Sequence, residues 1–557
     1  MESNCKVEIS MQTHEVKLMN GNITLLFDKN GFAYSLKFHG QECLDNLTGE
    51  PTDPDRNHSF YCDYHTNGKT VNLKPKKIKI IENTANIIHI SFIDNTQALG
   101  LAYHFILKKS EDKIYSYVKA WNNIAQPFAI NELRTVYRLD PNLFKIGFNG
   151  ERSGFQPSSK EMMAGKKLQD ETFLMKNGSL YDNSLVYSKY DYAGYFKDTN
   201  VWGQFGDNIG LWILTPDKSF YSCGPLNQDL MLHYDGLVLN YLVSEHFGKG
   251  LFTVPSNWSK VYGPWVIYLN NGSVKDAQNQ AIQEKKDFPY PWLNEKDMIT
   301  DLANINGKID SNISSTYRMI LTTSDPSKEP INQQKLGFTY DTCTQIDGSY
   351  YFTDIKYGHY WLCAYAIDGA DFDTHVLDEI EVNCSQITEK KFDLNSHEKI
   401  LWQIGQSSHT TAGFKFSDQL RNYCWQNLVP DNLDYVIGES TDWYYLQNDR
   451  GRWRIHFDLE HNEQNENIIL SFAFAGVTTK NMKNGFNPLV EVTINKKYKF
   501  SHEFNNDRSA YRSALKSGNY HLWQISLKDE ILQSHNIITI KTTGYIMYDS
   551  IKLSERE

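Results

Sequence analysis

The chain has 557 residues, of which 67 are acidic, 56 are lysine or arginine and 13% are aromatic, and its formal net charge is −11. This length exceeds what one hydrophobic core supports, so the sequence predicts several domains. The acidic balance argues against a nucleic-acid partner, because phosphate contacts need a basic face, although a polyanion could still bind in a local basic cleft. No run approaches the roughly 18 apolar residues of a membrane helix, so no membrane partner is predicted.

The N-terminal sequence MESNCKVEIS lacks the positively charged and apolar regions of a secretory signal. The eight cysteines form no CxxC pair and have no metal-ligand spacing. The sequence therefore predicts neither a disulfide scaffold nor a cysteine metal site, and one or two disulfides in an oxidising compartment remain an open alternative.

The first 270 residues are predicted to be strand after strand. In VKLMNGNITLLFDKNGFAYSLKFHG, an Asn-Gly and an Asp-Lys-Asn-Gly insertion separate alternating apolar runs, as in β-hairpins. The pattern predicts a large antiparallel β-domain of two stacked sheets. One helix is predicted over SVKDAQNQAIQEKKDF, and the prolines of PYPWL end it.

Two further β-domains are predicted after this helix. The segment QIDGSYYFTDIKYGHYWLCAYAIDG has Gly-containing turns before each strand, a spacing typical of a small fibronectin- or transthyretin-like sandwich. Period-2 runs such as RWRIHFDLE and VEVTINKKYKF predict a C-terminal jelly roll of the kind that binds carbohydrate. We therefore predict an all-β chain with domains at residues 1–298, 299–396 and 397–557.

Most common catalytic motifs do not occur: the sequence has no GxSxG, no HExxH, no Walker loop and no GxGxxG after a strand. A carboxylate pair for glycoside hydrolysis stays open, because so many acidic residues provide candidate pairs by chance. The run LNYLVSEHFG places His246 at the end of an apolar strand, before a glycine turn. A single histidine in such a place is more often a packing or surface residue than a functional one.

Basic and aromatic residues gather in the first predicted domain. Taken singly, each of them is most simply interpreted as a solvent-exposed residue of a strand or loop. Together they form a candidate site, in chain order: Arg134, Arg138, Arg152, Lys189 between Tyr187 and Tyr190, His233, Tyr241 and His246.

The ordered motifs ELRTVYRLD, SKYDYAG, GLWILTPDKSFYSCGPLNQDL, YLVSEHFG, VYGPWVIYLNNG, DGSYYFTDIKYGHYWLCAYA, ILWQIG and GYIMYDSIKL resemble the rhamnogalacturonan lyases of polysaccharide lyase family 4. The resemblance runs from about residue 130 to 555. It implies a catalytic β-sandwich of the super-sandwich type, a fibronectin-III-like domain and a jelly roll like a carbohydrate-binding module. Where family members often have Pro-Asp-Arg after the ILWQIG strand, this chain has Gln406-Ser407-Ser408-His409.

The resemblance implies an endolyase that cleaves the rhamnose-(1→4)-galacturonate bond of rhamnogalacturonan I in pectin. The reaction is a β-elimination that leaves a 4,5-unsaturated galacturonate and requires no cofactor. A structural calcium ion in the jelly roll, with Asp549 as a candidate ligand, is one expectation, but a single oxygen ligand is too few to assign a site. The implied partner is the pectic polysaccharide, and the implied protein is a secreted, extracellular monomer, although no signal peptide is visible.

The resemblance also implies roles for individual residues. Lys189 matches the catalytic base and His246 the second catalytic residue, which tunes the lysine, protonates the leaving oxygen, or does both. Arg134 is expected to grip the uronate carboxylate. Because lysine has an ordinary pKa of about 10.4, the prediction includes a pKa of Lys189 lowered by neighbouring cations, Arg134 and His246. Further substrate-binding residues are predicted to be Arg152, Tyr190 and Tyr241.

Two other functions remain open at this point. One is a glycoside hydrolase that acts on a pectic side chain with a carboxylate pair. The other is a non-catalytic carbohydrate-binding protein in which the lyase site has decayed, against which the presence of Lys189, His246 and Arg134 argues.

Overall fold

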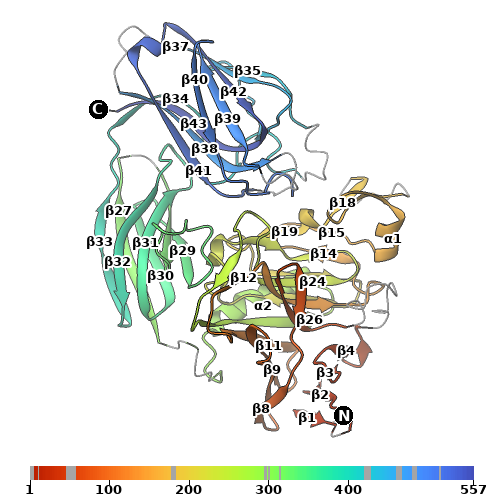
Figure 1. Cartoon of the computed structure of the whole chain (residues 1–557). Coiled ribbons are helices and arrows are strands. Elements are labelled where there is room, and N and C mark those ends of the chain that lie inside the picture. The colour runs from red at the N-terminus through yellow and green to blue at the C-terminus, as the bar shows by residue number, and fades with distance from the viewer. Residues whose placement is uncertain are drawn as a thin grey trace. The chain divides into compact units, whose positions relative to one another are not determined.

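The computed structural model consists mostly of β-strands (Figure 1), which confirms the prediction of a mainly β protein. It describes residues 5–10, 12–44, 58–176, 184–293, 298, 301–312, 315–419, 428–459, 467–479, 486–512 and 516–556. The chain divides into two compact units. The first comprises Met1–Glu245, Gly250–Thr300 and Lys335–Thr339, and the second comprises His246–Lys249, Asp301–Gln334 and Tyr340–Glu557. The three-domain division stays a prediction.

A nine-stranded antiparallel sheet is the largest element of the first unit. Its order is β15 (Ser153–Phe155), β14 (Ile146–Phe148), β20 (Val201–Phe205), β21 (Gly210–Leu214), β26 (Ser259–Asn270), β11 (Lys113–Asn122), β10 (Leu99–Lys108), β9 (Ile87–Asp94) and β8 (Lys77–Asn83).

Two five-stranded antiparallel sheets complete the main framework of this unit. The first is β1 (Lys6–Ile9), β2 (Val16–Met19), β3 (Ile23–Phe27), β4 (Ala33–Phe38) and β5 (Gln41–Glu42). Its predicted hairpin turns are confirmed, since Gly21 (φ 101°) follows β2 and Gly31 (φ 75°) follows β3 in the left-handed region. The second, which carries the candidate site, is β23 (Leu232–His233), β24 (Leu237–Val243), β13 (Glu132–Arg138), β6 (Tyr61–Thr66) and β7 (Lys69–Asn72).

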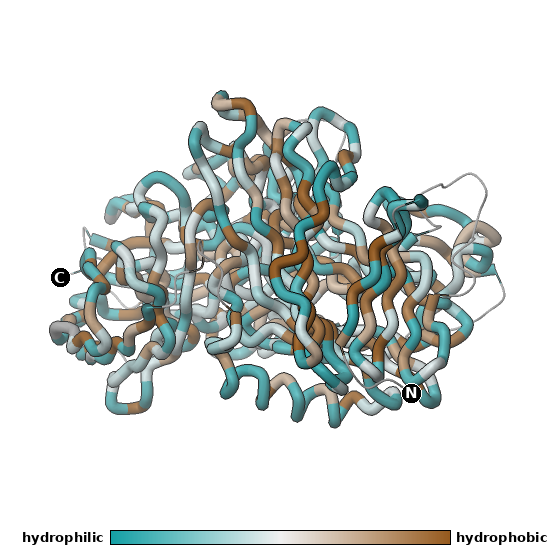
Figure 2. Tube along the Cα trace, turned by 90° about the horizontal axis from the view of Figure 1, so that it is seen from below, coloured by the Kyte–Doolittle hydropathy of each residue, from teal (hydrophilic) through white to brown (hydrophobic). Residues whose placement is uncertain are grey.

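The nine-stranded sheet and the β23–β7 sheet share one hydrophobic core. Tyr137 of β13 is at its centre: its hydroxyl lies 3.0 Å from that of Tyr103 on β10 and accepts a hydrogen bond of 2.9 Å from Trp265 Nε1 on β26. Successive side chains of a strand point to opposite faces, and apolar and polar residues alternate along many strands (Figure 2). The neighbours of Tyr137 on β13 therefore point away from this core.

The predicted helix is confirmed as α2 (Val274–Asp287), with Ser273 as its N-cap. Ala277 and Ala281 of α2 pack in a second apolar cluster with Trp212 and Val266, on the outer face of the nine-stranded sheet. A second helix, α1 (Ser159–Ala164), was not predicted, although Ser158 and Glu161 form a capping box at its start.

Short elements connect these sheets. They are β12 (Phe128–Ile130) paired with β25 (Phe252–Val254), β19 (Ala193–Tyr195) paired with β22 (Gln228–Leu230), the sheet β16 (Lys166–Gln169), β17 (Thr172–Leu174) and β18 (Val186–Ser188), and the single turns η2 (Lys189–Tyr192) and η3 (Gly224–Leu226).

The second unit contains four sheets. The first has the strand order β30 (Ser349–Lys356), β27 (Leu302–Asp310) and β33 (Gln386–Asp393). The second has the strand order β29 (Thr339–Cys343), β28 (Tyr317–Thr322), β31 (Gly358–Ala366) and β32 (Thr374–Val382). The third has the strand order β34 (Glu398–Gly405), β43 (Gly544–Arg556), β38 (Ile468–Thr479) and β41 (His521–Leu527), and β36 (Leu446–Gln447) also pairs with β43. The fourth has the strand order β35 (Leu433–Val436), β37 (Trp453–Asp458), β42 (His535–Thr542), β39 (Leu489–Ile494) and β40 (Tyr498–Glu503). The turn η6 (Asp529–Ile531) precedes β42. Across the described residues, no helix is long and apolar enough to cross a membrane.

Candidate functional site

A row of three polar side chains crosses the centre of the β23–β7 sheet. Arg134 on β13 lies opposite Asp63 on β6 and Tyr241 on β24. Its Nε donates to Asp63 Oδ1 at 2.9 Å, its Nη2 to Asp63 Oδ2 at 3.2 Å and its Nη1 to the Tyr241 hydroxyl at 2.9 Å. Burial opposes the guanidinium charge, but Asp63, Tyr241 and Tyr61 together outweigh burial and raise the pKa of Arg134 well above its usual value. Arg134 is therefore a fixed, permanently charged group.

The side chains beside this row are also polar. We call this outer side of the sheet the polar face, and its members are Tyr61, Asp63, His65, Glu132, Arg134, Arg138 and Tyr241. Glu132 Oε2 lies 3.4 Å from His65 Nδ1 and 3.8 Å from Arg134 Nη1. Arg138 Nη2 donates weakly to the Tyr61 hydroxyl at 3.4 Å, and its buried Nε has no partner among the described residues.

Lys189 opens the single turn η2 directly after β18. The Ser188 side chain accepts from the backbone N–H of Tyr190 and so caps the turn. Arg152 Nη1 donates to the Asp191 carbonyl oxygen at 2.8 Å, and the Tyr190 hydroxyl donates to Asp170 Oδ2 at 2.6 Å. Three side chains thus hold the turn that presents Lys189.

These contacts involve two predicted substrate-binding residues. Tyr190 is fully buried and its hydroxyl contacts Asp170, and its role in substrate binding stays a prediction. Arg152 remains a predicted substrate-binding residue, and its observed contact is to the Asp191 carbonyl.

The charge environment of Lys189 differs from the prediction. Its Nζ lies 2.8 Å from Glu171 Oε2 and 3.5 Å from Asp170 Oδ2. Burial alone would lower the pKa of Lys189, but the attraction of Glu171, then of Tyr190 and Asp170, raises that pKa well above the ordinary value. The prediction of a lysine pKa lowered by neighbouring cations is therefore wrong, because the nearest charges are carboxylates. In this structure Lys189 is an ammonium ion.

Lys189 and the polar face lie within electrostatic reach of one another. Arg134 and Lys189 both act on the ionisation of Tyr241. His233 on β23 is influenced by Glu171, Lys189 and Arg134, but burial is the largest effect and lowers the pKa of His233 to about 3. Its buried Nδ1 has no partner among the described residues. The sequence pattern singled out His233 without a role, and no local signal in the sequence pointed to Glu171.

His246 belongs to the second unit by its contacts. Its carbonyl oxygen accepts a hydrogen bond of 3.0 Å from Arg512 Nη1, and the Gly248 carbonyl accepts one of 2.7 Å from Asn519 Nδ2. The residue is only 5% exposed. The segment after β24 is therefore held by its own backbone carbonyls, and the catalytic role of the His246 imidazole stays a prediction.

The candidate calcium ligand Asp549 has a different set of partners. Its Oδ1 accepts from the Ser408 backbone N–H at 2.8 Å, the Ser408 hydroxyl at 3.0 Å and the Thr410 N–H at 3.2 Å. Burial raises the pKa of this carboxyl to about 7. Asp549 thus fastens the loop in which the chain departs from the family pattern, where His409 stacks between Tyr365 and Tyr520. The described residues contain no group of three His, Cys, Asp or Glu that could hold a metal ion, and the calcium ion stays a prediction.

Comparison with known proteins gives a consistent set of relatives. Residues 400–553 match the family model of the carbohydrate-binding-module-like domain III of polysaccharide lyase family 4. A rhamnogalacturonate lyase of Dickeya dadantii is 32% identical over 562 aligned residues, which cover 99% of this chain and 95% of that protein. Rhamnogalacturonate lyase B of Emericella nidulans is 23% identical over 84% of this chain and 81% of its own length, and a probable rhamnogalacturonate lyase B of Aspergillus flavus is 23% identical over 78% and 72%.

Proposed function

The chain belongs to the rhamnogalacturonate lyases of polysaccharide lyase family 4, and from this membership we propose that it cleaves the rhamnogalacturonan I backbone of pectin at internal bonds. The near-complete coverage of a relative that is 32% identical supports the proposal. We further propose that the first unit is a β-super-sandwich, that residues 299–396 are fibronectin-III-like and that residues 397–557 form the jelly roll. The paired sheets of each region support this assignment.

The proposed reaction is β-elimination at a galacturonate residue. A base removes the proton on C5, a C4–C5 double bond forms, and the C4 oxygen leaves with its rhamnose. Negative charge develops on the carboxylate next to C5, so a fixed cation there stabilises the transition state. Arg134 supplies this cation, Lys189 in its neutral form is the base, and His246 is the proposed proton donor to the leaving oxygen. The product is a 4,5-unsaturated galacturonate.

The observation that carries this proposal is the placement of Lys189 and Arg134 around Tyr241. Arg134, the proposed carboxylate-binding cation, contacts the Tyr241 hydroxyl, and Lys189, the proposed base, lies close enough to influence the pKa of the same buried phenol. Elimination next to a carboxylate needs both groups around one sugar.

Two carboxylates of this region, Glu171 and Asp63, favour elimination over hydrolysis. A glycoside hydrolase needs a carboxylic acid with a raised pKa to protonate the leaving oxygen. Glu171 has the opposite property: burial would raise the pKa of its carboxyl, but Lys189, His233 and Tyr234 together outweigh burial and lower it. Asp63 is bound in two hydrogen bonds to Arg134. Neither group is suited to be a general acid.

Ultraviolet absorbance tests the proposal on the intact protein. Elimination creates a double bond conjugated with the carboxylate, whereas hydrolysis and simple binding do not. We expect absorbance to rise with time when the protein is mixed with rhamnogalacturonan I, in proportion to the reducing ends formed. Reducing ends without absorbance would identify a hydrolase, and neither signal would identify a binding protein.

The ion pair at Lys189 predicts how activity depends on pH. Only the neutral amine accepts the C5 proton, and the raised pKa of Lys189 keeps the amine protonated until the medium is alkaline. We therefore expect kcat/KM to rise with pH through and above neutrality. Glu171→Gln removes the largest influence that raises this pKa, so the rising limb should move to lower pH. Each unit of that shift should increase kcat/KM at neutral pH about tenfold. An unmoved limb in Glu171→Gln would assign the limb to another group.

The role of His246 is tested by His246→Ala. If the imidazole protonates the leaving oxygen, kcat/KM should fall by roughly 10²- to 10⁴-fold. Substrates with a better leaving group than rhamnose should be affected less, which gives the control. An unchanged rate would return His246 to a structural role.

We also propose that the protein acts outside the cell as a monomer. The reason is chemical, because a polymer as large as pectin does not cross a membrane. Sedimentation of the purified protein tests the monomer, and fractionation of its producing cells tests the location.

A further inference from the structure

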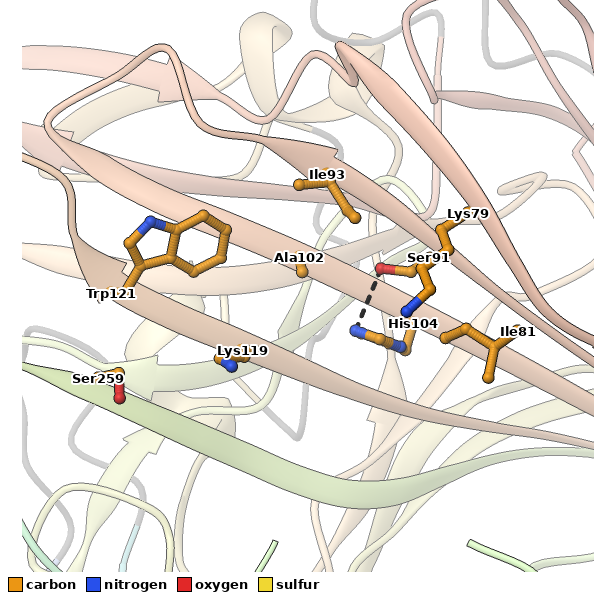
Figure 3. A pocket seen from close by; sticks show the side chains of 9 residues that line it. All are labelled: Lys79, Ile81, Ser91, Ile93, Ala102, His104, Lys119, Trp121 and Ser259. Atoms are coloured by element: carbon orange, nitrogen blue, oxygen red, sulfur yellow. Dashed lines mark hydrogen bonds between the residues drawn. The ribbon is translucent and has the colours of Figure 1, made fainter. Parts of the chain in front are cut away.

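A pocket of about 460 Å³ lies on the outer face of the nine-stranded sheet, away from the polar face. On β10, Leu101, Tyr103 and Phe105 point into the shared core, so Ala102 and His104 point outward. Helix α2 covers the part of this outer face formed by β21 and β26. The pocket occupies the part formed by β8 to β11, with Ser259 of β26 at its edge (Figure 3).

The sheet itself builds the hollow, because short side chains lie between long ones. Ser91 on β9 and Ala102 on β10 form the floor. Lys79 and Ile81 rise from β8 on one side, and the side chains of β11 rise on the other. Cross-strand pairing fixes this order, since Lys79 lies opposite Ser91 and Ala102 lies opposite Lys119. The pocket is therefore a property of the strand register rather than of a loop.

The indole ring of Trp121 on β11 packs directly against a glycine of the neighbouring strand. It lies opposite Gly100, and a Cβ atom added at Gly100 would be 2.1 Å from the indole Cε2 and 2.3 Å from Nε1. Any larger residue at position 100 would push the ring away. The indole thus rests on the backbone of β10, at one end of the pocket, as a fixed apolar platform (Figure 3).

The charged side chains that line the pocket are basic, although the chain carries −11 overall. Its nine lining residues include Lys79 and Lys119 but no Asp or Glu. Lys79 is exposed and forms no ion pair with any residue that the structure describes. His104 lies on the floor between them, 3.1 Å from Ser91 Oγ and 3.0 Å from His89 Nε2. Burial, followed by His89 and the two lysines, lowers the pKa of His104, so the lysines alone carry the positive charge.

We propose that this pocket is an accessory binding site for a galacturonate unit of the acidic polysaccharide, separate from the site of elimination. Trp121 would stack on the apolar C–H face of the sugar ring, and Lys79 would pair with its carboxylate. Ser91 provides a hydroxyl group between them. The identity of the sugar rests on the proposed function, since an enzyme for an acidic polymer meets uronate units at every second position of its substrate.

The position of the pocket predicts what it does for the enzyme. The pocket and the polar face lie on opposite outer sides of sheets that pack through Tyr103 and Tyr137. A short oligosaccharide cannot reach both sides, because the packed sheets alone are about 10 Å apart. The accessory site therefore holds the protein on long chains and leaves the turnover of short substrates unchanged.

Affinity electrophoresis of the full-length protein tests this proposal with polygalacturonate as the probe. This polymer carries the uronate but lacks the rhamnose linkage, so binding is measured independently of the lyase reaction. We expect Trp121→Ala and Lys79→Glu each to weaken retention by polygalacturonate roughly tenfold or more. The matched control is Lys37→Glu, which changes the same charge at an exposed lysine of β4. A neutral galactan in the gel should retain none of the proteins.

Each outcome decides the proposal. Equal retention of the wild type, Trp121→Ala and Lys79→Glu would overturn it, and so would a wild type that polygalacturonate does not retain. If Trp121→Ala fails to fold, Lys79→Glu still tests the proposal, since a substitution at an exposed residue usually changes the free energy of unfolding by less than about 0.5 kcal/mol. If the wild type shows no elimination but the two variants still lose retention, the accessory site stands and the proposed lyase function falls.

Discussion

Replacing Lys189 with alanine is expected to lower kcat/KM for elimination by roughly 10²- to 10⁴-fold, the contribution typical of a positioned general base. Among the residues that the structure describes, no other amine is held on this side of the site by a capped turn and two carboxylates. The loss should appear mainly in kcat, because the base acts after the polymer is bound. Initial rates of double-bond formation on rhamnogalacturonan I measure it.

The control for this variant must separate chemistry from stability. Removing the ammonium leaves Glu171 partly buried without its cation, which destabilises the fold by itself. The double variant Lys189→Ala/Glu171→Gln removes that charge and should be as inactive as the single variant but more stable. Lys167→Ala, at an exposed lysine of the neighbouring strand β16, should keep full activity. A folded Lys189→Ala protein with more than about a tenth of the normal rate would contradict the assignment of the base.

Arg134→Lys is expected to reduce kcat/KM by roughly 10²- to 10³-fold although it keeps the positive charge. A lysine cannot make the forked contact to both oxygens of Asp63 and reach the Tyr241 hydroxyl at the same time. The cation would move from its fixed place, and the developing charge on the uronate would lose its partner. Lysine is a cleaner test than alanine, because alanine would leave the buried Asp63 carboxylate unpaired.

Arg138→Lys is the matched comparison for this second variant. Arg138 lies on the same face and strand, but the hydrogen bond from its guanidinium to the Tyr61 hydroxyl is long. We expect a much smaller loss there. If Arg138→Lys lost most activity and Arg134→Lys kept it, Arg138 would be the group that binds the carboxylate.

Several features of the fold followed from local sequence. The Asn-Gly and Asp-Lys-Asn-Gly turns were predictable because residues with φ above zero favour glycine, and Gly21 and Gly31 adopt such angles. Helix α2 was predictable from its length and its capping serine. Helix α1 has only six residues, too few to show a helical period, so only its capping box could have revealed it.

The candidate site was less predictable, because its charges come from separate strands. The pattern of basic residues identified Arg134 and Lys189. The partner of Lys189 depends on the register of β17 and β18, in which Thr172 lies opposite Ser188 and the backbone N–H of Lys189 donates to the Glu171 carbonyl. A shift of one residue would turn the Glu171 side chain to the other face. The direction of the lysine pKa therefore could not be predicted from sequence.

The mass of the products tests the central claim most directly. The substrate is a defined oligosaccharide with one rhamnose-(1→4)-galacturonate bond, and the reaction is run in water enriched in ¹⁸O. Elimination adds no water, so the masses of the two products should sum to the mass of the substrate and neither should carry ¹⁸O from the cleavage. Products whose masses sum to that of the substrate plus one water, with ¹⁸O incorporated at the cleaved bond, would show hydrolysis and contradict the assignment of this chain as a lyase.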